Sequence, residues 1–170
     1  MYLTTRDLVL QPIREEDLAD LAALFMDDVV KQTYMVPDFA DASQALALAG
    51  RIKALSEDEN RYVAGIFLND KCIGLLNETE RSANTLEVGY ALLPAYHNRG
   101  YCTQALRASV AHLFAQGFTE VLAGAFESNL ASLRVMEKSG MTPLQKQDQV
   151  TYRGKTHRCL YYHAVKEVNA

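Results

Sequence analysis

The stretch 87–106 reads Glu87-Val-Gly-Tyr-Ala-Leu-Leu-Pro-Ala-Tyr-His-Asn-Arg-Gly-Tyr-Cys-Thr-Gln-Ala-Leu106. It predicts a strand that ends before Pro94, a short polar loop, and a helix that begins inside the loop. The first N–H groups of a helix and its dipole favour an anion, and Gly100 allows close backbone approach. The stretch lacks the glycine and lysine spacing of a P-loop and the triple glycine of a dinucleotide fold, so we expect a phosphate ligand other than ATP or NAD.

The flanking sequence predicts a mixed α/β fold in one domain, residues 1–170, because no repeat or linker divides the chain. Alternating and continuous apolar runs predict strands at 8–13, 62–68, 72–77, 86–92, 120–126, 141–147 and 156–165. Helical spacing predicts helices after the acidic triplet 15–17, after the capping pattern at Asp41 and Gln44, and at 101–116 and 129–139. The longest helix bridges two strands as a crossover connection would.

The composition limits the classes of function. The net charge is −4, with 49% hydrophobic and 22% charged residues, which excludes a disordered chain and argues against nucleic-acid or membrane partners. The cysteines Cys72, Cys102 and Cys159 are odd in number and lack metal-ligand or redox spacing. The residues 1–7 do not form the basic end of a secretory signal. We therefore expect a cytoplasmic protein with reduced thiols and no metal.

Two further motifs carry a family resemblance. The loop reads His97-Asn-Arg-Gly-Tyr-Cys102, and the run Glu127-Ser-Asn-Leu-Ala-Ser-Leu-Arg-Val-Met-Glu-Lys-Ser-Gly-Met141 follows the next strand. With the strand 86–90, these motifs resemble the GNAT N-acetyltransferases, in particular the Rim-type branch, which is similar to ribosomal-protein N-terminal acetyltransferases. The loop keeps the central glycine of the family pattern and departs from it at His97 and Cys102. The resemblance extends from about residue 8 to the last strand.

The resemblance implies a fold and a co-substrate. We expect a central, mostly antiparallel mixed sheet of about seven strands, splayed between the fourth and fifth, with about four flanking helices. Acetyl-CoA would be the co-substrate, its pantetheine arm lying in the splay. A backbone N–H at the end of the fourth strand would polarise the thioester carbonyl. The residues implied in CoA binding are Leu92, Leu93, His97, Arg99, Gly100, Tyr101, Cys102, Thr103, Asn129 and Ser132.

Two candidate catalytic residues follow. The acceptor amine must lose a proton, and Glu87 is the candidate base because burial beside the splay would raise its pKa. The alternative is a carboxylate that orders a water molecule or pairs with a cation. Ser132 is the position at which the Rim-type branch places a serine near the CoA sulfur, and the alternative is a hydrogen bond to its own helix. Met136 stands where many relatives carry a tyrosine acid, and it is interpreted as core packing.

Several residues have a simpler interpretation as packing. Cys102 fits a small apolar filler better than a nucleophile. Tyr152 and the pair Tyr161-Tyr162 are assigned to packing around the last strands, with a place in the acceptor pocket as the alternative. The remaining histidines, His112, His157 and His163, are expected on the surface or in strands.

The sequence leaves two functions open. The first is transfer of acetyl to a primary amine, either a peptide N-terminus or a small molecule, and the second is a non-catalytic acyl-CoA-binding module. We expect the segments 27–44 and a turn near 149–155 to border the binding site of the acceptor amine. Four acidic side chains in the first segment either attract a cationic amine or form a solvated face: Asp27, Asp28, Asp38 and Asp41. The Rim-type branch often dimerises, so a homodimer stays open, as does an acyl group other than acetyl.

Overall fold

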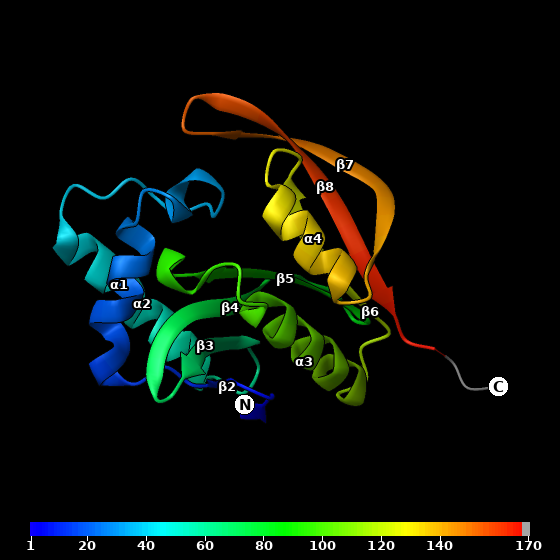
Figure 1. Ribbon diagram of the computed structural model, residues 1–170, viewed down its shortest axis with the longest axis horizontal. Coiled ribbons are helices and arrows are strands. Elements are labelled where there is room, and N and C mark those ends of the chain that lie inside the picture. The colour runs from blue at the N-terminus through cyan, green and yellow to red at the C-terminus, as the bar shows by residue number, and fades with distance from the viewer. Residues whose placement is uncertain (168–170) are drawn as a thin grey trace. The chain divides into compact units, whose positions relative to one another are not determined.

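The computed structural model describes residues 1–167, in which helices and strands are interleaved along the chain (Figure 1). The strands are β1 (Leu3–Thr4), β2 (Val9–Gln11), β3 (Val63–Leu68), β4 (Lys71–Arg81), β5 (Thr85–Leu92), β6 (Glu120–Phe126), β7 (Thr142–Tyr152) and β8 (Lys155–Val165). The α-helices are α1 (Leu18–Met26), α2 (Ala42–Glu57), α3 (Tyr101–Ala115) and α4 (Leu130–Lys138). Three short 3-10 helices are η1 (Glu15–Asp17), η2 (Val30–Gln32) and η3 (Pro94–Tyr96). In the described part of the chain, no helix is long and apolar enough to cross a membrane.

The strands pair in the order β1-β2-β3-β4-β5-β6-β8-β7. The β5–β6 pair is parallel, and the pairs β1–β2, β2–β3, β3–β4, β6–β8 and β7–β8 are antiparallel, which confirms the predicted mixed, mostly antiparallel sheet. The sequence analysis did not predict β1, which has only two residues. The chain divides into two compact units, the first formed by 1–77 and 90–105 and the second by 78–89 and the residues from 106 onward.

The first unit has its core between α1, α2 and the strands β3 and β4. Leu21, Leu24 and Phe25 of α1 are almost fully buried, together with Ala45 and Ala49 of α2. The two alanines let the helices approach closely, because no larger side chain separates them. The sequence prediction that α1 turns this face inward is confirmed, although its first turn, η1, is a 3-10 helix.

Helix α2 begins at the predicted cap. The Asp41 carboxylate accepts hydrogen bonds from the N–H groups of Ser43 and Gln44, at 2.9 and 3.2 Å. The Gln44 amide oxygen accepts from the N–H of Ala40, one residue before the cap. The hydrogen bonds to the Asp41 carboxylate confirm one half of the predicted capping box. In the other half, the Gln44 side chain accepts from the N–H of Ala40 instead of from the N–H of Asp41.

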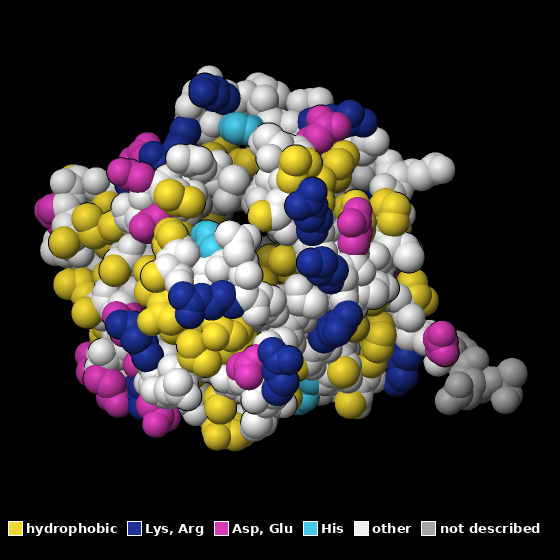
Figure 2. Space-filling model, viewed as in Figure 1, with side chains coloured by type: hydrophobic (Ala, Val, Ile, Leu, Met, Phe, Trp, Pro, Cys, Tyr) yellow, Lys and Arg dark blue, Asp and Glu magenta, His cyan; other side chains and the backbone are white. Residues whose placement is uncertain are grey.

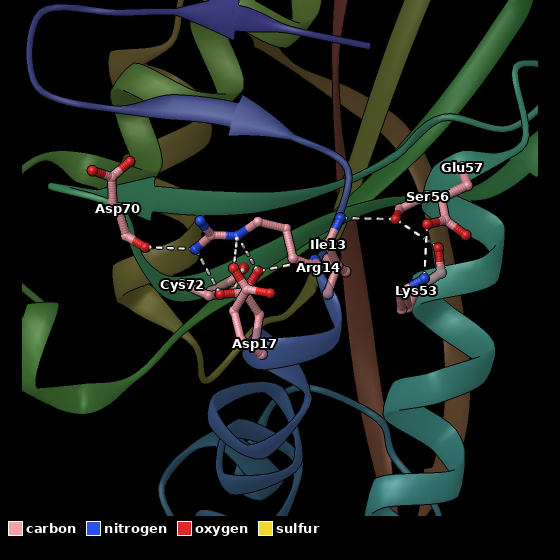
Figure 3. A network of polar contacts seen from close by, with 10 residues as sticks. Ile13, Arg14, Asp17, Lys53, Ser56, Glu57, Asp70 and Cys72 are labelled. Carbon is pink, nitrogen blue, oxygen red and sulfur yellow. Dashed lines mark hydrogen bonds and ion pairs between the residues drawn. The ribbon is translucent and has the colours of Figure 1, made fainter.

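A polar network joins η1 to its neighbours in the first unit (Figure 3). Asp17 is 3% exposed, and its carboxylate accepts from the backbone N–H, Nε and Nη2 of Arg14. The Arg14 guanidinium also donates to the carbonyl of Asp70, at 2.7 Å. Beside it, the N–H of Ile13 donates to Ser56 Oγ at 2.9 Å, which links the end of β2 to α2. The network satisfies polar groups that burial would otherwise leave without water.

We expect Asp17→Ala to lower the free energy of unfolding by about 1–3 kcal/mol, because the N–H groups of Arg14 lose the buried carboxylate that accepts their hydrogen bonds. Asp20→Ala is the matched control, since Asp20 is a partly exposed carboxylate in the first turn of α1, and it lies 3.4 Å from Lys71 Nζ. Its expected effect is within about 0.5 kcal/mol. Urea denaturation measures both. Equal losses in the two variants would contradict the role assigned to Asp17.

The hairpin β3–β4 has the predicted two-residue turn. Asn69 and Asp70 have φ values of 48° and 63°, and Leu68 pairs directly with Lys71. Positive φ at both central residues defines a type I′ turn, whose twist matches the flanking strands. Asparagine and aspartate tolerate this conformation better than other non-glycine residues, which explains why this sequence forms the turn.

The end predicted for the strand at 141–147 was wrong. Strand β7 continues to Tyr152, and the turn consists only of Arg153 and Gly154, with φ values of 51° and 72°. An irregularity between Pro143 and Gln147 shifts the register, so the hydrophobic alternation is interrupted there. The residues beyond it are mostly exposed and polar, so they carry little strand pattern.

The second unit contains the start of β5 with β6, β8 and β7. Leu86 and Val88 of β5, with Val121 and Ala123 of β6, are buried on one face. Helix α4 lies over this face (Figure 1), and the Tyr162 hydroxyl donates to Glu137 Oε1 of α4 at 3.0 Å. Because side chains alternate along a strand, the residues between these positions in β5 and β6 project from the opposite face.

Candidate acetyl-CoA and amine sites

The end of β5 is held by backbone bonds. The N–H of Leu93 donates to the carbonyl of Ile73 in β4, at 2.9 Å. The N–H that is expected to donate to the thioester carbonyl therefore cannot be that of Leu93. Successive N–H groups of a strand point to opposite edges, so the Leu92 N–H points away from β4 and is the remaining candidate.

His97 lies against the same strand end. Its Nε2 is 2.8 Å from the carbonyl oxygen of Leu92, and a carbonyl can only accept, so Nε2 carries the proton of this bond. The ring is thereby oriented at the exit from β5, with Nδ1 as its other polar atom. This geometry places His97 on the loop before α3, as the sequence predicts.

The loop before α3 contains two left-handed residues. Asn98 has φ 60° and Gly100 has φ 78°, and the first helical bond runs from the N–H of Gln104 to the carbonyl of Gly100. The N–H groups from Gly100 to Thr103 therefore precede the first intrahelical donor and are the ones that a helix start offers to a ligand. A Cβ at Gly100 would meet no atom within 4 Å, so glycine is required by the backbone conformation rather than by crowding.

The first turn of α3 is fixed to the loop 5–7. The side-chain oxygen of Gln104 accepts from Thr5 Oγ1 and from the N–H of Asp7, at 3.0 and 3.2 Å. Its Nε2 donates to the Asp7 carboxylate at 2.7 Å. One amide thus makes three hydrogen bonds, which hold the helix start in place. On the same turn, burial raises the pKa of the Cys102 thiol to about 12, which agrees with the packing role predicted for it.

Glu87 lies near the start of β5 in the second unit. It alternates with the buried Leu86 and Val88 and therefore projects from the face opposite α4. Its Oε1 accepts a hydrogen bond from Thr79 Oγ1 of β4, at 3.0 Å. Burial raises the pKa of the Glu87 carboxyl above its ordinary value, and the bond from Thr79 and the charge of Lys146 oppose that rise.

Asn129 begins α4 as its N-cap. Its Oδ1 accepts from the N–H of Ser132 at 3.2 Å, so the cap places Ser132 on the first turn of the helix. Met136 is fully buried, which confirms the packing role that the sequence predicts for it. Glu87 and α4 lie on opposite sides of the strand layer, so the two candidate catalytic residues are presented from different faces.

The candidate residues thus fall into two sets. The loop set, which belongs to the first unit, consists of Leu92, Leu93, His97, Arg99, Gly100, Tyr101, Cys102 and Thr103. The second unit carries Glu87, Asn129 and Ser132. The structure brings the loop set together along the end of β5 and the start of α3, and it joins Asn129 to Ser132 through the helix cap, whereas Glu87 lies on the other face of the strands.

The parallel pairing between β5 and β6 covers only the first half of β5. Its register runs from Thr85↔Glu120 to Val88↔Ala123, whereas β5 continues to Leu92. Strand β6 continues to pair with β8 as far as Phe126↔Cys159. The parallel pairing of β5 with β6, the two strands that α3 connects, therefore involves only the start of β5.

The other aromatic residues have packing roles. The ring of His157 stacks on Phe126 with their centroids 4.2 Å apart, and Tyr152 lies 6.1 Å from Phe126. The ring of Tyr161 covers Gly124, where a Cβ would come within 2.8 Å of it, and Lys146 Nζ lies 4.2 Å from the ring centroid. His163 Nδ1 is 2.6 Å from Glu120 Oε1. In residues 1–167 no group of three or more metal-ligating side chains is found.

The acidic residues of the segment 27–44, which was expected to border the acceptor site, have local partners. Asp27 accepts from the N–H groups of Val29 and Val30, at 2.9 and 3.0 Å, and Asp28 pairs with Lys31. Asp41 caps α2, as described above. Local structure therefore accounts for three of the four aspartates, which favours the interpretation as a solvated, structural face.

The sequence did not identify the groups that surround Glu87. Thr79 on β4, and Lys146 and Asp148 on β7, each act on its carboxylate. These residues are separated from Glu87 along the chain and are brought near it by strand pairing. No local motif marks them, and only the register of the strands could have identified them.

Charge is distributed unevenly over the surface. Figure 2 shows Lys and Arg side chains gathered on the displayed face, where α3 and α4 lie. In the second unit the exposed members are Arg107, Arg134 and Lys138, and the Arg107 guanidinium also donates to the carbonyl of Lys138. A chain with a net charge of −4 therefore carries a locally basic surface, which can meet an anion.

These features define the class of protein: a mixed, mostly antiparallel sheet with a glycine-containing loop that leads into a helix start. The family model of the acetyltransferase (GNAT) domain matches residues 7–142. The chain therefore belongs to the GNAT acetyltransferase family, whose general reaction is acetyl transfer from acetyl-CoA to an amine.

The chain is also similar to individual proteins. The uncharacterized N-acetyltransferase YoaA of Bacillus subtilis (strain 168) is 26% identical over an alignment of 143 residues, with coverage of 81% of this chain and 81% of that protein. A GNAT-family acetyltransferase from Bacillus anthracis has a TM-score of 0.84 at 18% identity, covering 97% of this chain and 98% of that one. RimL, a ribosomal L7/L12 α-N-protein acetyltransferase in complex with coenzyme A, has a TM-score of 0.85 at 18% identity, with the same coverage. At this identity, the structures establish the fold.

Proposed function

We propose that this chain, acting as one acetyltransferase domain, transfers acetyl from acetyl-CoA to a primary amine by direct attack, with Glu87 as the base. The observation that carries the proposal is the start of α3, where left-handed Asn98 and Gly100 precede a row of N–H groups. Such a row binds a diphosphate without requiring a cationic side chain.

The cofactor would be held along the loop set. The N–H groups of Arg99, Gly100, Tyr101, Cys102 and Thr103 bind the pyrophosphate, and Leu92 and Leu93 border the pantetheine arm. His97, Asn129 and Ser132 complete the proposed CoA contacts. The register of β5 with β6 ends at Val88, so this pairing does not involve the last residues of β5, beside which the arm would lie. The Leu92 N–H, which points away from β4, is the proposed donor to the thioester carbonyl.

The chemistry follows from the proton balance. An ammonium has no lone pair, so the Glu87 carboxylate first takes a proton from the acceptor, directly or through water. The amine nitrogen then attacks the thioester carbon, a C–N bond forms, and the C–S bond breaks. The adduct nitrogen still carries one proton more than an amide, and it releases that proton as the leaving CoA thiolate takes one up, while the Ser132 hydroxyl donates a hydrogen bond to the sulfur. The proton that Glu87 took from the ammonium passes to water. A pKa of Glu87 raised by burial brings the base closer to neutrality, which improves proton transfer.

For the acceptor we favour a peptide N-terminal amine, with small amines second. RimL, which shares the fold, is named as a ribosomal L7/L12 α-N-protein acetyltransferase. An acetyltransferase from Salmonella typhimurium is described as modifying the N-terminal serine of L7/L12. Its structure has a TM-score of 0.81 at 18% identity, covering 98% of this chain and 100% of that one. These are properties of those proteins, and they support the order in which acceptors should be tested.

The function is tested by measuring release of free CoA from acetyl-CoA in the presence of N-terminal peptides, polyamines and amino acids. Release that depends on a peptide or small amine, with a mass increase of one acetyl group on the acceptor, is the expected result. Binding of acetyl-CoA with no release against the panel would contradict the enzyme and favour a non-catalytic acyl-CoA-binding module. Parallel reactions with longer acyl-CoA molecules establish which acyl group is used.

Ser132→Ala is expected to lower kcat about three- to thirtyfold while the pH profile keeps its shape, because the thiolate loses a hydrogen-bond partner at the sulfur. Ser128→Ala is the matched control, because Ser128 is an exposed serine just before the Asn129 cap. Steady-state kinetics with acetyl-CoA measures both. Wild-type kinetics for Ser132→Ala would assign its hydroxyl to the helix instead.

A further inference from the structure

The Glu87 carboxylate is held at one of its two oxygens. Thr79 Oγ1, on the neighbouring strand β4, donates to Glu87 Oε1 at 3.0 Å. A threonine in a strand has few side-chain rotamers, so its hydroxyl is a directed donor rather than a mobile one. With Oε1 engaged from β4, Oε2 is the oxygen that stays available to accept a proton from another molecule.

The other groups around Glu87 are charged or titratable and come from three strands. Glu80 of β4 and Asp148 of β7 raise the pKa of Glu87, and Lys146 of β7 lowers it. From β8, Tyr161 and Cys159 also interact with the Glu87 charge.

These neighbours differ from Thr79 in what they can do for the carboxylate. The Lys146 ammonium lies 4.2 Å from the centre of the Tyr161 ring, so it also interacts with that ring. Glu80 and Asp148 carry the same sign of charge as Glu87 and cannot orient it by a hydrogen bond when ionised. Thr79 is the neutral group that donates a hydrogen bond to this carboxylate, and a hydrogen bond to the ionised form stabilises that form.

We propose that Thr79 is a positioning residue for acetyl transfer, whose hydroxyl holds the ionised Glu87 carboxylate so that Oε2 faces the acceptor amine. This inference rests on the proposed function, because it requires Glu87 to act as the base. Thr79 does not touch the reacting atoms in this account, and it acts only through Glu87.

The test is the pH dependence of kcat/KM in Thr79→Val, which keeps the shape of the side chain and removes the donor. Without the donor, the pKa of Glu87 rises, and activity that needs the ionised base is lost at a higher pH. The acid limb of the profile is therefore expected to move up by about half to one pH unit. At a pH on that limb, kcat/KM falls about three- to tenfold. The KM for acetyl-CoA is expected to stay unchanged.

Two controls separate positioning from a structural role. Thr79→Ser restores the donor and is expected to restore the position of the acid limb. Thr85→Val removes a similar strand hydroxyl, which lies 3.5 Å from the Glu120 carboxylate, and is expected to leave the limb where it is. A uniform loss of activity in Thr79→Val without movement of the limb, or no change at all, overturns the inference.

Glu87→Gln distinguishes failure of this inference from failure of the proposed function. If Glu87→Gln retains the wild-type acid limb, Glu87 is not the base, and the proposed function fails together with the inference. If Glu87→Gln abolishes the limb while Thr79→Val leaves it in place, only the role of Thr79 is contradicted.

Discussion

Glu87→Gln is expected to lower kcat by about 10²- to 10⁴-fold, because the amide cannot take the proton that the acceptor amine must lose. The acid limb of the wild-type pH profile, where activity falls as Glu87 becomes protonated, should disappear in the variant. The affinity for acetyl-CoA should stay near that of the wild type, since the loop set is unchanged. Steady-state kinetics across the pH range and acetyl-CoA titrations measure the three quantities.

The fold of this variant should be intact. The glutamine Oε1 can still accept the bond from Thr79. Burial raises the pKa of Glu87 above 4.5, so its contribution to stability is present below that pH and is lost as the pH rises through the higher value in the folded protein. Removing the charge therefore costs no stability at neutral pH, and the Tm should equal or exceed that of the wild type.

Glu80→Gln is the matched control for the charge change. Glu80 is an exposed carboxylate near Glu87 whose charge raises the pKa of Glu87. Its removal should leave kcat nearly unchanged and move the acid limb slightly to lower pH. A Glu87→Gln variant with wild-type turnover would assign Glu87 to ordering water or pairing with a cation.

Gly100→Val is expected to raise the dissociation constant of acetyl-CoA by at least about tenfold. Valine is strongly disfavoured at φ 78°, at a cost of about 1–2 kcal/mol or more, so the loop must change its conformation and move its N–H groups. The new side chain would also point into the open space beside Gly100, where it would obstruct a ligand. Isothermal titration calorimetry with acetyl-CoA measures the change.

Gly117→Val is the control for this variant. Gly117 follows α3 with φ 104°, and a Cβ there would also meet no atom within 4 Å. The two substitutions impose a similar backbone strain, so both should lower the Tm, but only Gly100→Val should weaken acetyl-CoA binding. Equal acetyl-CoA affinity in the two variants would mean that the loop at Gly100 does not hold the phosphates.

The elements with a strong local signal could be predicted from the sequence. The Asn69-Asp70 turn was found because both residues favour the left-handed conformation that the hairpin requires. Helix α4 was found because Asn129 caps its start and Gly140, with φ 86°, follows its end. In both cases the chemistry of a few adjacent residues determines the backbone.

The features that depend on pairing between distant segments could not be predicted. The middle of β7 is a strand because it pairs with β8, since its residues 145–149 are all polar and show no hydrophobic alternation. The bond between Thr79 and Glu87 depends in the same way on the pairing of β4 and β5. Likewise, the position of Glu87 in a strand could be predicted from the sequence, whereas the groups that shift its pKa could not.

The central claim is that the start of α3 binds the diphosphate of acetyl-CoA, and calorimetric titration of the purified, folded protein with acetyl-CoA tests it most directly. We predict saturable binding of one acetyl-CoA per chain, weakened in Gly100→Val and retained in Gly117→Val. An absence of affinity for CoA in any acylated form would contradict the account.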